Sequence, residues 1–116
     1  MKSGLKVEDL ARIAHEANRA YCRGIYDYSH KSWDDTPQEI KDTTIAGVEF
    51  LINNPSVSPS DMHNNWCKDK ASKGWKYGPR KDVENKLHPC MVEYLDLSEE
   101  QRLKDSLFST IIKVFL

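Results

Sequence analysis

The sequence predicts a mostly α-helical domain with a minor β element. Apolar residues recur at helical spacing in four segments, most of which open on a capping motif. Residues 74–97 show no helical period, and short strands are expected there. The chain has 116 residues, enough for one domain with one modest core. We therefore expect a single compact domain over residues 1–116, with its core between about 7 and 114.

The first two helices are expected on either side of an irregular linker. The first spans Val7 to Cys22, with Gly24 just beyond as a stop. The second opens at Thr36-Pro37-Gln38-Glu39, which has the composition of a capping box with proline at the first helical position, and Asn53-Asn54-Pro55 ends it. Their expected buried faces are Leu10, Ile13, Ala14, Ala17 and Tyr21 in the first helix, and Ile40, Thr44, Val48, Leu51 and Ile52 in the second.

The third and fourth helices have similar start signals. Ser58-Pro59-Ser60-Asp61 opens a helix that continues to about Ser72, and Gly74 closes it. Ser98-Glu99-Glu100-Gln101 opens the last helix. Its expected apolar stripe is Leu103, Leu107, Phe108, Ile111 and Phe115.

The segment between these two helices is expected to be an ordered loop with a two-stranded β element. Lys76-Tyr77 and Met91-Val92 are the expected strands. Pro79 and Pro89 keep both of them short, because proline cannot donate to a strand ladder.

Charge is unevenly distributed along the chain. Between Lys68 and Lys86, seven basic residues stand against three acidic ones, a net charge of +4, so the rest carries −5 within a total of −1. The near-neutral total argues against binding to nucleic-acid polymers, which need a sustained basic surface. The sequence contains no run of about 18 apolar residues, so no membrane span is expected. Three widely spaced cysteines and the lack of an apolar leader predict reduced thiols in the cytoplasm.

The residue pattern predicts neither a metal site nor an enzyme. His15-Glu16 has the start of a zinc-binding helix, but the position four residues after the histidine is Arg19. The four histidines and three cysteines show no paired spacing, and no cofactor is expected. His88 and Cys90 lie close in sequence, yet a structural role is expected for Cys90. No nucleophile, base and orienting group can be named together.

Aromatic and basic residues near the +4 window are the candidates for ligand binding. Trp75 and Tyr77 alternate with basic residues and suit either a core or a ligand surface. Trp66 lies in an otherwise polar helical segment with His63, where it covers a helix junction, a subunit contact or a ligand ring. Phosphate contacts or a solvated face are the alternatives for nearby lysines, namely Lys70, Lys73 and Lys81.

Two candidates lie outside that window. Trp33 belongs to the irregular segment between residues 24 and 35. Arg19 lines a cleft with His15 in one interpretation. In the other it completes an exposed ion-pair ladder with Arg12 and Glu16.

Several segments together form a recognisable pattern, namely Ile13 to Ala20, Trp33, Gly47-Val48, Gly74 to Pro79 with Lys81-Asp82, His88-Pro89-Cys90, and Leu97 to Phe108. Together they resemble the RyR domain, the repeat found in tandem in ryanodine receptor calcium channels and singly in bacteria and phages. The resemblance covers about residues 7–114 and implies a compact four-helix fold with minor β structure.

The resemblance also implies a function. Paired repeats in the channels hold adenine nucleotides between them, which implies a homodimer here, with Trp66 of each protomer flanking the base and Lys70 and Lys81 near the phosphates. Trp75 and Tyr77 would mainly build the fold. We therefore expect a non-catalytic module that binds or senses a linear or cyclic adenine-nucleotide-like ligand in a phage-defence setting. The alternative is a structural or protein-interaction module without a small-molecule ligand. The expected site residues are Trp66, Lys70, Lys73, Lys81, Trp33, His63 and Arg19.

Overall fold

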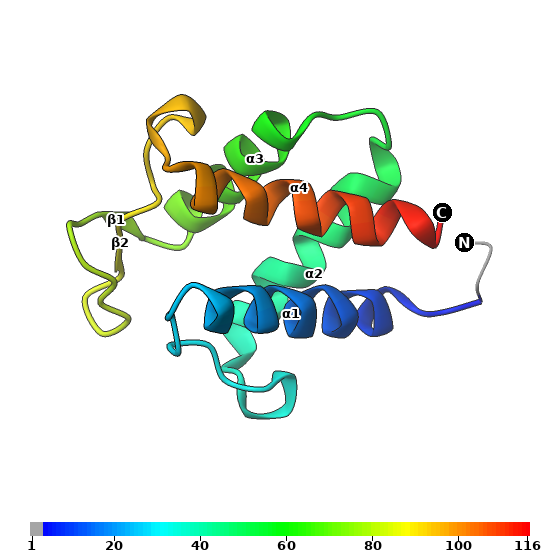
Figure 1. The fold of residues 1–116 in the computed structure, drawn as a ribbon, viewed down its shortest axis with the longest axis horizontal. Helices are drawn as coiled ribbons and strands as arrows, with labels where there is room; N and C mark the ends of the chain where they lie inside the picture. Colours follow the sequence, from blue (N-terminus) through cyan, green and yellow to red (C-terminus); the bar gives the residue numbers. More distant parts are fainter. Residues whose placement is uncertain (1–3) are drawn as a thin grey trace.

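The computed structural model describes residues 4–116. Over that range the chain is mostly helical with a minor β element, as predicted (Figure 1). The α-helices are α1 (Val7–Gly24), α2 (Gln38–Asn53), α3 (Pro59–Ser72) and α4 (Glu99–Val114). The shorter elements are the 3-10 turns η1 (Trp33–Asp35) and η2 (Tyr94–Asp96), and the strands β1 (Lys76–Tyr77) and β2 (Leu87–His88).

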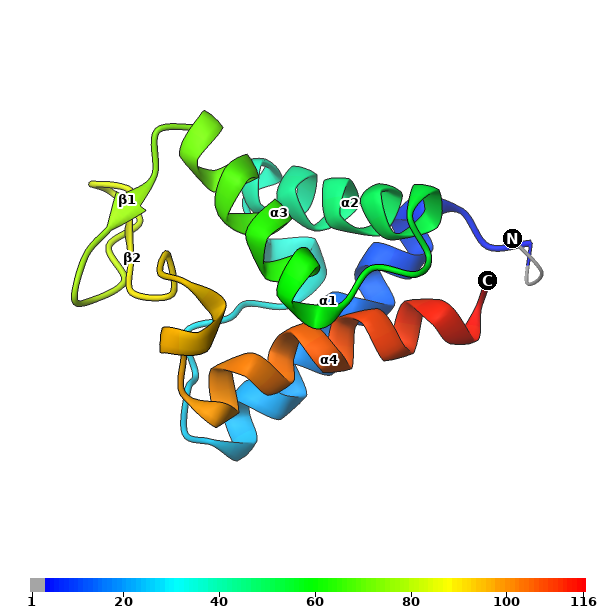
Figure 2. The same ribbon diagram turned by 90° about the horizontal axis from the view of Figure 1, so that it is seen from above.

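Each of the four helices packs against at least two others. α1 packs against α2 and α4, and α3 packs against α4 and α2. Figures 1 and 2 show the strands and η2 at one end of the bundle, while α4 finishes at the opposite end near the beginning of α1. Among the described residues, no helix combines the length and apolar character that a membrane crossing needs.

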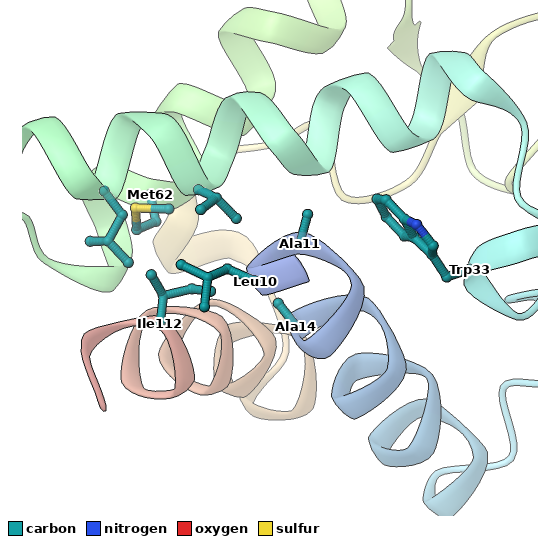
Figure 3. Close-up of a cluster of buried hydrophobic side chains, with 8 residues drawn as sticks. Leu10, Ala11, Ala14, Trp33, Met62 and Ile112 are labelled. Carbon is teal, nitrogen blue, oxygen red and sulfur yellow. The ribbon is translucent and has the colours of Figure 1, made fainter. Parts of the chain in front are cut away.

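An apolar core fills the part of the bundle remote from the strands (Figure 3). Most of it comes from the first half of α1, the second halves of α2 and α4, and the start of α3, while Trp33 of η1 lies apart from the other labelled side chains in Figure 3. Removing these side chains from water stabilises the fold by roughly 25 cal/mol per Å² of apolar surface. The buried members are Leu10, Ala11, Ala14, Trp33, Val48, Leu51, Met62 and Ile112.

The predicted ends of α3 are confirmed. The Ser58 hydroxyl accepts from the Asp61 amide at 3.1 Å, and the Asp61 carboxylate accepts from the Ser58 amide at 3.0 Å. At the other end, Gly74 has a φ of +89°. The amide of Trp75 returns to the carbonyl of Lys70 at 3.1 Å, which completes a Schellman cap. The cap leads the chain directly into β1.

The capping box predicted at Thr36 is wrong. α2 begins at Gln38, and its N-terminus has no side-chain cap. The Thr36 hydroxyl instead donates to the carbonyl of Ser32 at 2.7 Å and lies 3.3 Å from Nε2 of His15. The hydroxyl is thus used to fix the linker against α1.

The end of α1 also differs from the prediction. The helix continues to Gly24, two residues beyond Cys22, because Tyr26 takes the left-handed conformation with a φ of 65°. The amide of Asp27 then returns to the carbonyl of Cys22 at 2.8 Å. A non-glycine residue therefore supplies the stop that Gly24 was expected to provide.

The second strand is Leu87–His88 rather than the predicted Met91-Val92, and it pairs with β1 in parallel. Close packing of Gly78 on Leu87 favours this pairing, since a Cβ on Gly78 would lie only 2.7 Å from the Cβ of Leu87. The β1–β2 loop therefore folds back over the strand that follows it.

The predicted buried faces are confirmed in part. Leu10, Ala14, Val48 and Leu51 are buried. In α4 the expected stripe is displaced: Leu103 is 47% exposed, whereas Ile112 is fully buried. The other expected positions are partly buried, namely Ile13, Ala17, Tyr21, Ile40, Thr44, Ile52, Leu107, Phe108, Ile111 and Phe115.

Candidate functional site

A cavity of about 220 Å³ lies among the four helices. The parts of α1, α2 and α4 that line it are the ends nearer the strands in Figure 2. All four helices, the segment after α1 and the region around β2 contribute to its wall. The volume is below the roughly 300–1,000 Å³ of typical small-molecule sites, so it is sized for a small ligand or for part of a larger one.

All four histidines of the chain line this cavity, and three of them have defined hydrogen bonds. Nε2 of His15 donates to the carbonyl of Lys31 at 2.7 Å, and Nε2 of His63 donates to the carbonyl of Val92 at 2.8 Å. Nδ1 of His88 accepts from the amide of Cys90 at 3.1 Å. Because a carbonyl only accepts and an amide N–H only donates, the proton lies on Nε2 in the neutral form of each ring.

Burial keeps two of the histidines neutral. Burial lowers the pKa of His88 to about 3, and the nearby ammonium of Lys81 adds to the effect. The same two causes lower the pKa of His30 to about 4. Both rings are therefore uncharged at neutral pH. In His88 the acceptor nitrogen is taken by the amide of Cys90, which leaves the N–H at Nε2 as a donor.

Three lysines supply positive charge to the cavity, namely Lys70, Lys81 and Lys104. Within residues 4–116, none of them forms a salt bridge with a carboxylate. Lys70 is only 4% exposed, and burial followed by the charge of Lys81 lowers its pKa to about 8. Lys81 is exposed as a residue, yet burial of its ammonium group lowers its pKa, an effect that Asp27 opposes and Lys104 reinforces.

Two tryptophans surround the ammonium of Lys70. Its Nζ lies 4.2 Å from the ring centroid of Trp75 and 6.0 Å from that of Trp66. Trp75 is buried, and its indole N–H donates to the carboxylate of Glu39 on α2 at 3.0 Å. Trp75 thus builds the wall behind Lys70, as the resemblance implied. Tyr77, in contrast, is 54% exposed and takes no part in the core.

Trp66 forms an aromatic surface inside the cavity. Its ring stacks on His63 at a centroid distance of 5.8 Å and an interplanar angle of 25°. It meets His88 edge to face at 4.9 Å. Phe108 and Met62 add apolar surface. The amides of Asn18, Asn65 and Gln101 add uncharged donors and acceptors to the lining.

Two acidic residues complete the lining. Asp69 is neutralised by Lys73, whose Nζ lies 3.1 Å from its carboxylate. Oδ2 of Asp105 lies 3.7 Å from Nδ1 of His63, and burial raises the pKa of this carboxyl to about 7. The positive charges of the lysines are therefore only partly balanced.

The structure brings together four of the seven predicted site residues: His63, Trp66, Lys70 and Lys81. The other three lie outside the lining. Trp33 is 1% exposed in the apolar core, and Arg19 pairs with Glu16 at 3.3 Å. Lys73 donates to the hydroxyl of Thr43 at 2.8 Å and supports the wall from behind.

Sequence reasoning missed His30, His88, Lys104 and Asp105, and it named His15 only in the interpretation that puts it in a cleft with Arg19. In α1 and α4 a signal exists, because polar residues continue the buried stripe at helical spacing. His15 and Asn18 follow Ala14, while Lys104 and Asp105 precede Phe108. His30 and His88 lie outside the helices and had no comparable signal in the sequence.

A cysteine, a histidine and an aspartate are arranged in a way that resembles a catalytic triad. Sγ of Cys67 lies 3.4 Å from Nε2 of His63, whose other nitrogen faces Asp105. However, Nε2 carries the proton given to Val92, so it cannot accept the thiol proton. Burial, followed by Asp105, raises the pKa of Cys67 to about 11. The thiol is therefore a poor nucleophile.

A second grouping has metal-ligand residue types. Possible ligand atoms of Cys22, Asp27 and His30 lie within 4.8 Å of one another. A cation there would be repelled by two ammonium groups, since the positive charges of Lys104 and Lys81 both act on Cys22 and His30. Because this repulsion opposes a divalent ion, we assign no metal to the grouping.

The second half of the chain matches a known family. The model of the RyR domain matches residues 55–116, which is 62 of the 116 residues and includes α3, both strands and α4. No solved structure matches the chain. The matched segment supplies Trp66, Lys70, Lys81, His88 and Asp105 to the cavity. The chain belongs to the RyR domain family.

Proposed function

We propose that the chain is a non-catalytic module that binds or senses a small anionic ligand carrying a ring, of the adenine-nucleotide type. One observation carries the proposal: a single cavity combines an aromatic surface at Trp66 with three lysines that lack salt-bridge partners among residues 4–116. This combination suits a ring attached to a phosphate.

The charges in the cavity favour an anion. A buried ammonium without an ion pair is destabilised relative to water, and the lowered pKa of Lys70 records that cost. A phosphate placed among Lys70, Lys81 and Lys104 offsets it with charge-assisted hydrogen bonds. Stacking of a base on an aromatic side chain adds roughly 1–3 kcal/mol.

Binding without chemistry is the form of the proposal that the side chains favour. The nearest approach to a catalytic group is the set of Cys67, His63 and Asp105. Its histidine has the wrong tautomer to act as a base toward the thiol. The neutral rings of His30 and His88 suit fixed hydrogen bonds to a ligand better than proton transfer at neutral pH.

The homodimer and the phage-defence setting remain proposals drawn from the family resemblance, and the cytoplasmic location remains a proposal drawn from the widely spaced cysteines. The residues that line the cavity all belong to one chain, which supports binding by a single protomer. Light scattering with and without ligand tests the dimer separately. A dimer that forms only with ligand would favour a shared cleft.

The test is calorimetry and thermal shift with adenosine, AMP, cyclic AMP and inorganic phosphate. We expect AMP to bind more tightly than adenosine or phosphate alone, because only AMP meets both parts of the cavity. Trp66→Ala and Lys81→Met should each weaken AMP binding at least tenfold. Lys76→Met is the matched control, since this exposed lysine of β1 does not line the cavity, and it should leave affinity unchanged.

A failure of all four compounds to bind the wild-type chain would contradict the proposal. The protein-interaction alternative would then be favoured. Exposed apolar side chains support that alternative, with Tyr26 85%, Tyr28 63% and Leu95 81% exposed. Equal losses of AMP affinity in Lys76→Met and Lys81→Met would indicate that the anion binds outside the cavity.

A further inference from the structure

Asp105 is an acid in a cavity that otherwise favours anions. Its side chain is 20% exposed, and its Oδ2 lies 3.7 Å from Nδ1 of His63. That distance is within reach of an ion pair but too long for a hydrogen bond. The carboxyl therefore has no strong partner fixed by the geometry among the described residues.

The charged groups around Asp105 come from several elements. On α4 its neighbour Lys104 favours the ionised carboxyl. On α3 it faces His63 and Cys67, and on the segment after β2 it acts on Cys90.

The remaining walls contribute less charge near this acid. α1 adds His15, and α2 adds no titratable residue to the lining. His30, Lys81 and His88 lie on the loops, and burial keeps both of these histidines neutral.

The two protonation states of Asp105 have opposite effects on an anion. An ionised carboxylate only accepts hydrogen bonds and repels a phosphate, whereas a protonated carboxyl donates one O–H. Burial places the pKa near 7, so both states are populated at neutral pH. A phosphate in the cavity raises this pKa further, because like charge disfavours ionisation.

We propose that Asp105 is a proton-gated ligand contact, which donates a hydrogen bond to the anionic group of the ligand when protonated and excludes that group when ionised. The inference rests on the proposed function of the cavity. Above pH 7 the bound complex gains one proton from solvent, which joins a carboxylate oxygen of Asp105, and no other bond forms or breaks. At higher pH, Lys70 also takes up protons when the ligand binds, because the anion favours the charged form of this lysine.

The experiment is calorimetry with AMP at pH 7 and pH 8, in two buffers of different ionisation enthalpy. If only protonated Asp105 admits the phosphate, wild-type affinity should fall about fivefold between these pH values, with a measurable proton uptake. In Asp105→Asn, which mimics the neutral acid, the fall should be less than about twofold, and binding at pH 8 should be tighter than in wild type. Glu100→Gln is the matched control and should keep the wild-type affinity and slope, since Glu100 is an exposed acid on the same helix that does not line the cavity.

The outcomes distinguish the proton gate at Asp105 from the proposed ligand-binding function. Equal pH slopes in wild type and Asp105→Asn overturn the proton gate and leave the ligand-binding function standing. No AMP binding by the wild type at either pH removes both. A carbon-13 titration of the Asp105 carboxyl gives a second readout that needs no variant. Its midpoint should lie near 7 in the free protein and rise with AMP, and an unchanged midpoint in a saturated sample overturns the inference.

Discussion

The two halves of the helical bundle differ in the side chains that the same helices direct toward the interior. Away from the strands, Leu10, Val48 and Ile112 are fully buried against one another. Toward the strands, the same helices α1, α2 and α4 present polar side chains to a cavity. Ala14 and Met62 belong to both regions and mark the boundary. Stability thus comes mainly from one half, while the other half places charges and hydrogen-bonding groups around a cavity.

The largest expected effect comes from opening a hole in the apolar half. Leu10→Ala should lower the free energy of unfolding by roughly 3–4 kcal/mol, because the side chain is fully buried and neighbouring helices can relax only partly. Urea unfolding measures the loss. Leu103→Ala is the control, since Leu103 is 47% exposed, and it should change stability by less than about 0.5 kcal/mol. Similar losses in both variants would mean that the apolar half does not dominate stability.

The second effect belongs to the polar half and depends on pH. The pKa of Asp105 is about 7 in the folded chain, above the roughly 3.9 of an unfolded aspartate, so the native state binds more protons between these values. Its contribution to stability is therefore present below pH 4 and is lost as pH rises toward 7. Asp105→Asn should stabilise the fold at pH 8 by about 2 kcal/mol and have little effect at pH 4.

The quantity to compare in that experiment is the difference in stability between wild type and Asp105→Asn at each pH. His30 and His88 have lowered pKa values, so they destabilise the fold as pH falls below about 6.5, opposite in sign to Asp105. Thermal unfolding of both proteins at each pH cancels their contribution. A gain that does not change with pH would contradict the buried-carboxyl explanation. The loss in Leu10→Ala should show no such dependence.

The sequence predicts much of the fold because helical signals are local. The capping box at Ser58 and the cap at Gly74 each lie within a few residues and function as predicted. The prediction at Thr36 fails because a tertiary contact competes for the hydroxyl, which turns toward His15. The strand Leu87–His88 depends on packing against Gly78, which no local pattern reveals.

The cavity is less predictable because its residues are far apart in sequence. Metal-ligand or catalytic spacing is the signal by which histidines are usually recognised, and here the four histidines have none. Folding places them in one wall by packing α1 beside α4 and α3 beside α2. Trp66 could be found in advance because a tryptophan in a polar helix stands out. Asp105 could not, since an aspartate beside a lysine on a helix is typical of a solvated face.

A third, smaller effect tests the wall behind Lys70. Trp75→Phe keeps a ring beneath Lys70 but removes the hydrogen bond from the indole to Glu39. We expect a loss of about 1–2 kcal/mol in urea unfolding, since the bond involves a charged acceptor. Trp66→Phe should cost less, because Trp66 is only partly buried and its indole has no such partner among the described residues. The reverse order would show that Trp66, and not Trp75, supports Lys70.

The smallest expected effect lies outside both halves, at the left-handed residue that ends α1. Tyr26 has a φ of 65° and is 85% exposed, so its side chain contributes little packing to offset the strain. A left-handed conformation costs a non-glycine residue roughly 1–2 kcal/mol, and glycine avoids this but loses more entropy on folding. Tyr26→Gly should therefore stabilise the fold by less than about 1 kcal/mol and leave ligand affinity unchanged.

The neighbouring tyrosine gives the matched control for that variant. Tyr28 has no positive φ, and the guanidinium of Arg23 lies 5.2 Å from its ring centroid. Tyr28→Gly should therefore lower stability slightly, since it relieves no strain and removes a cation–π contact. Thermal unfolding of both variants measures the contrast. If Tyr26→Gly lowers stability, packing holds the tyrosine in place. The turn that leads to His30 would then belong to the polar half and would not lie outside it.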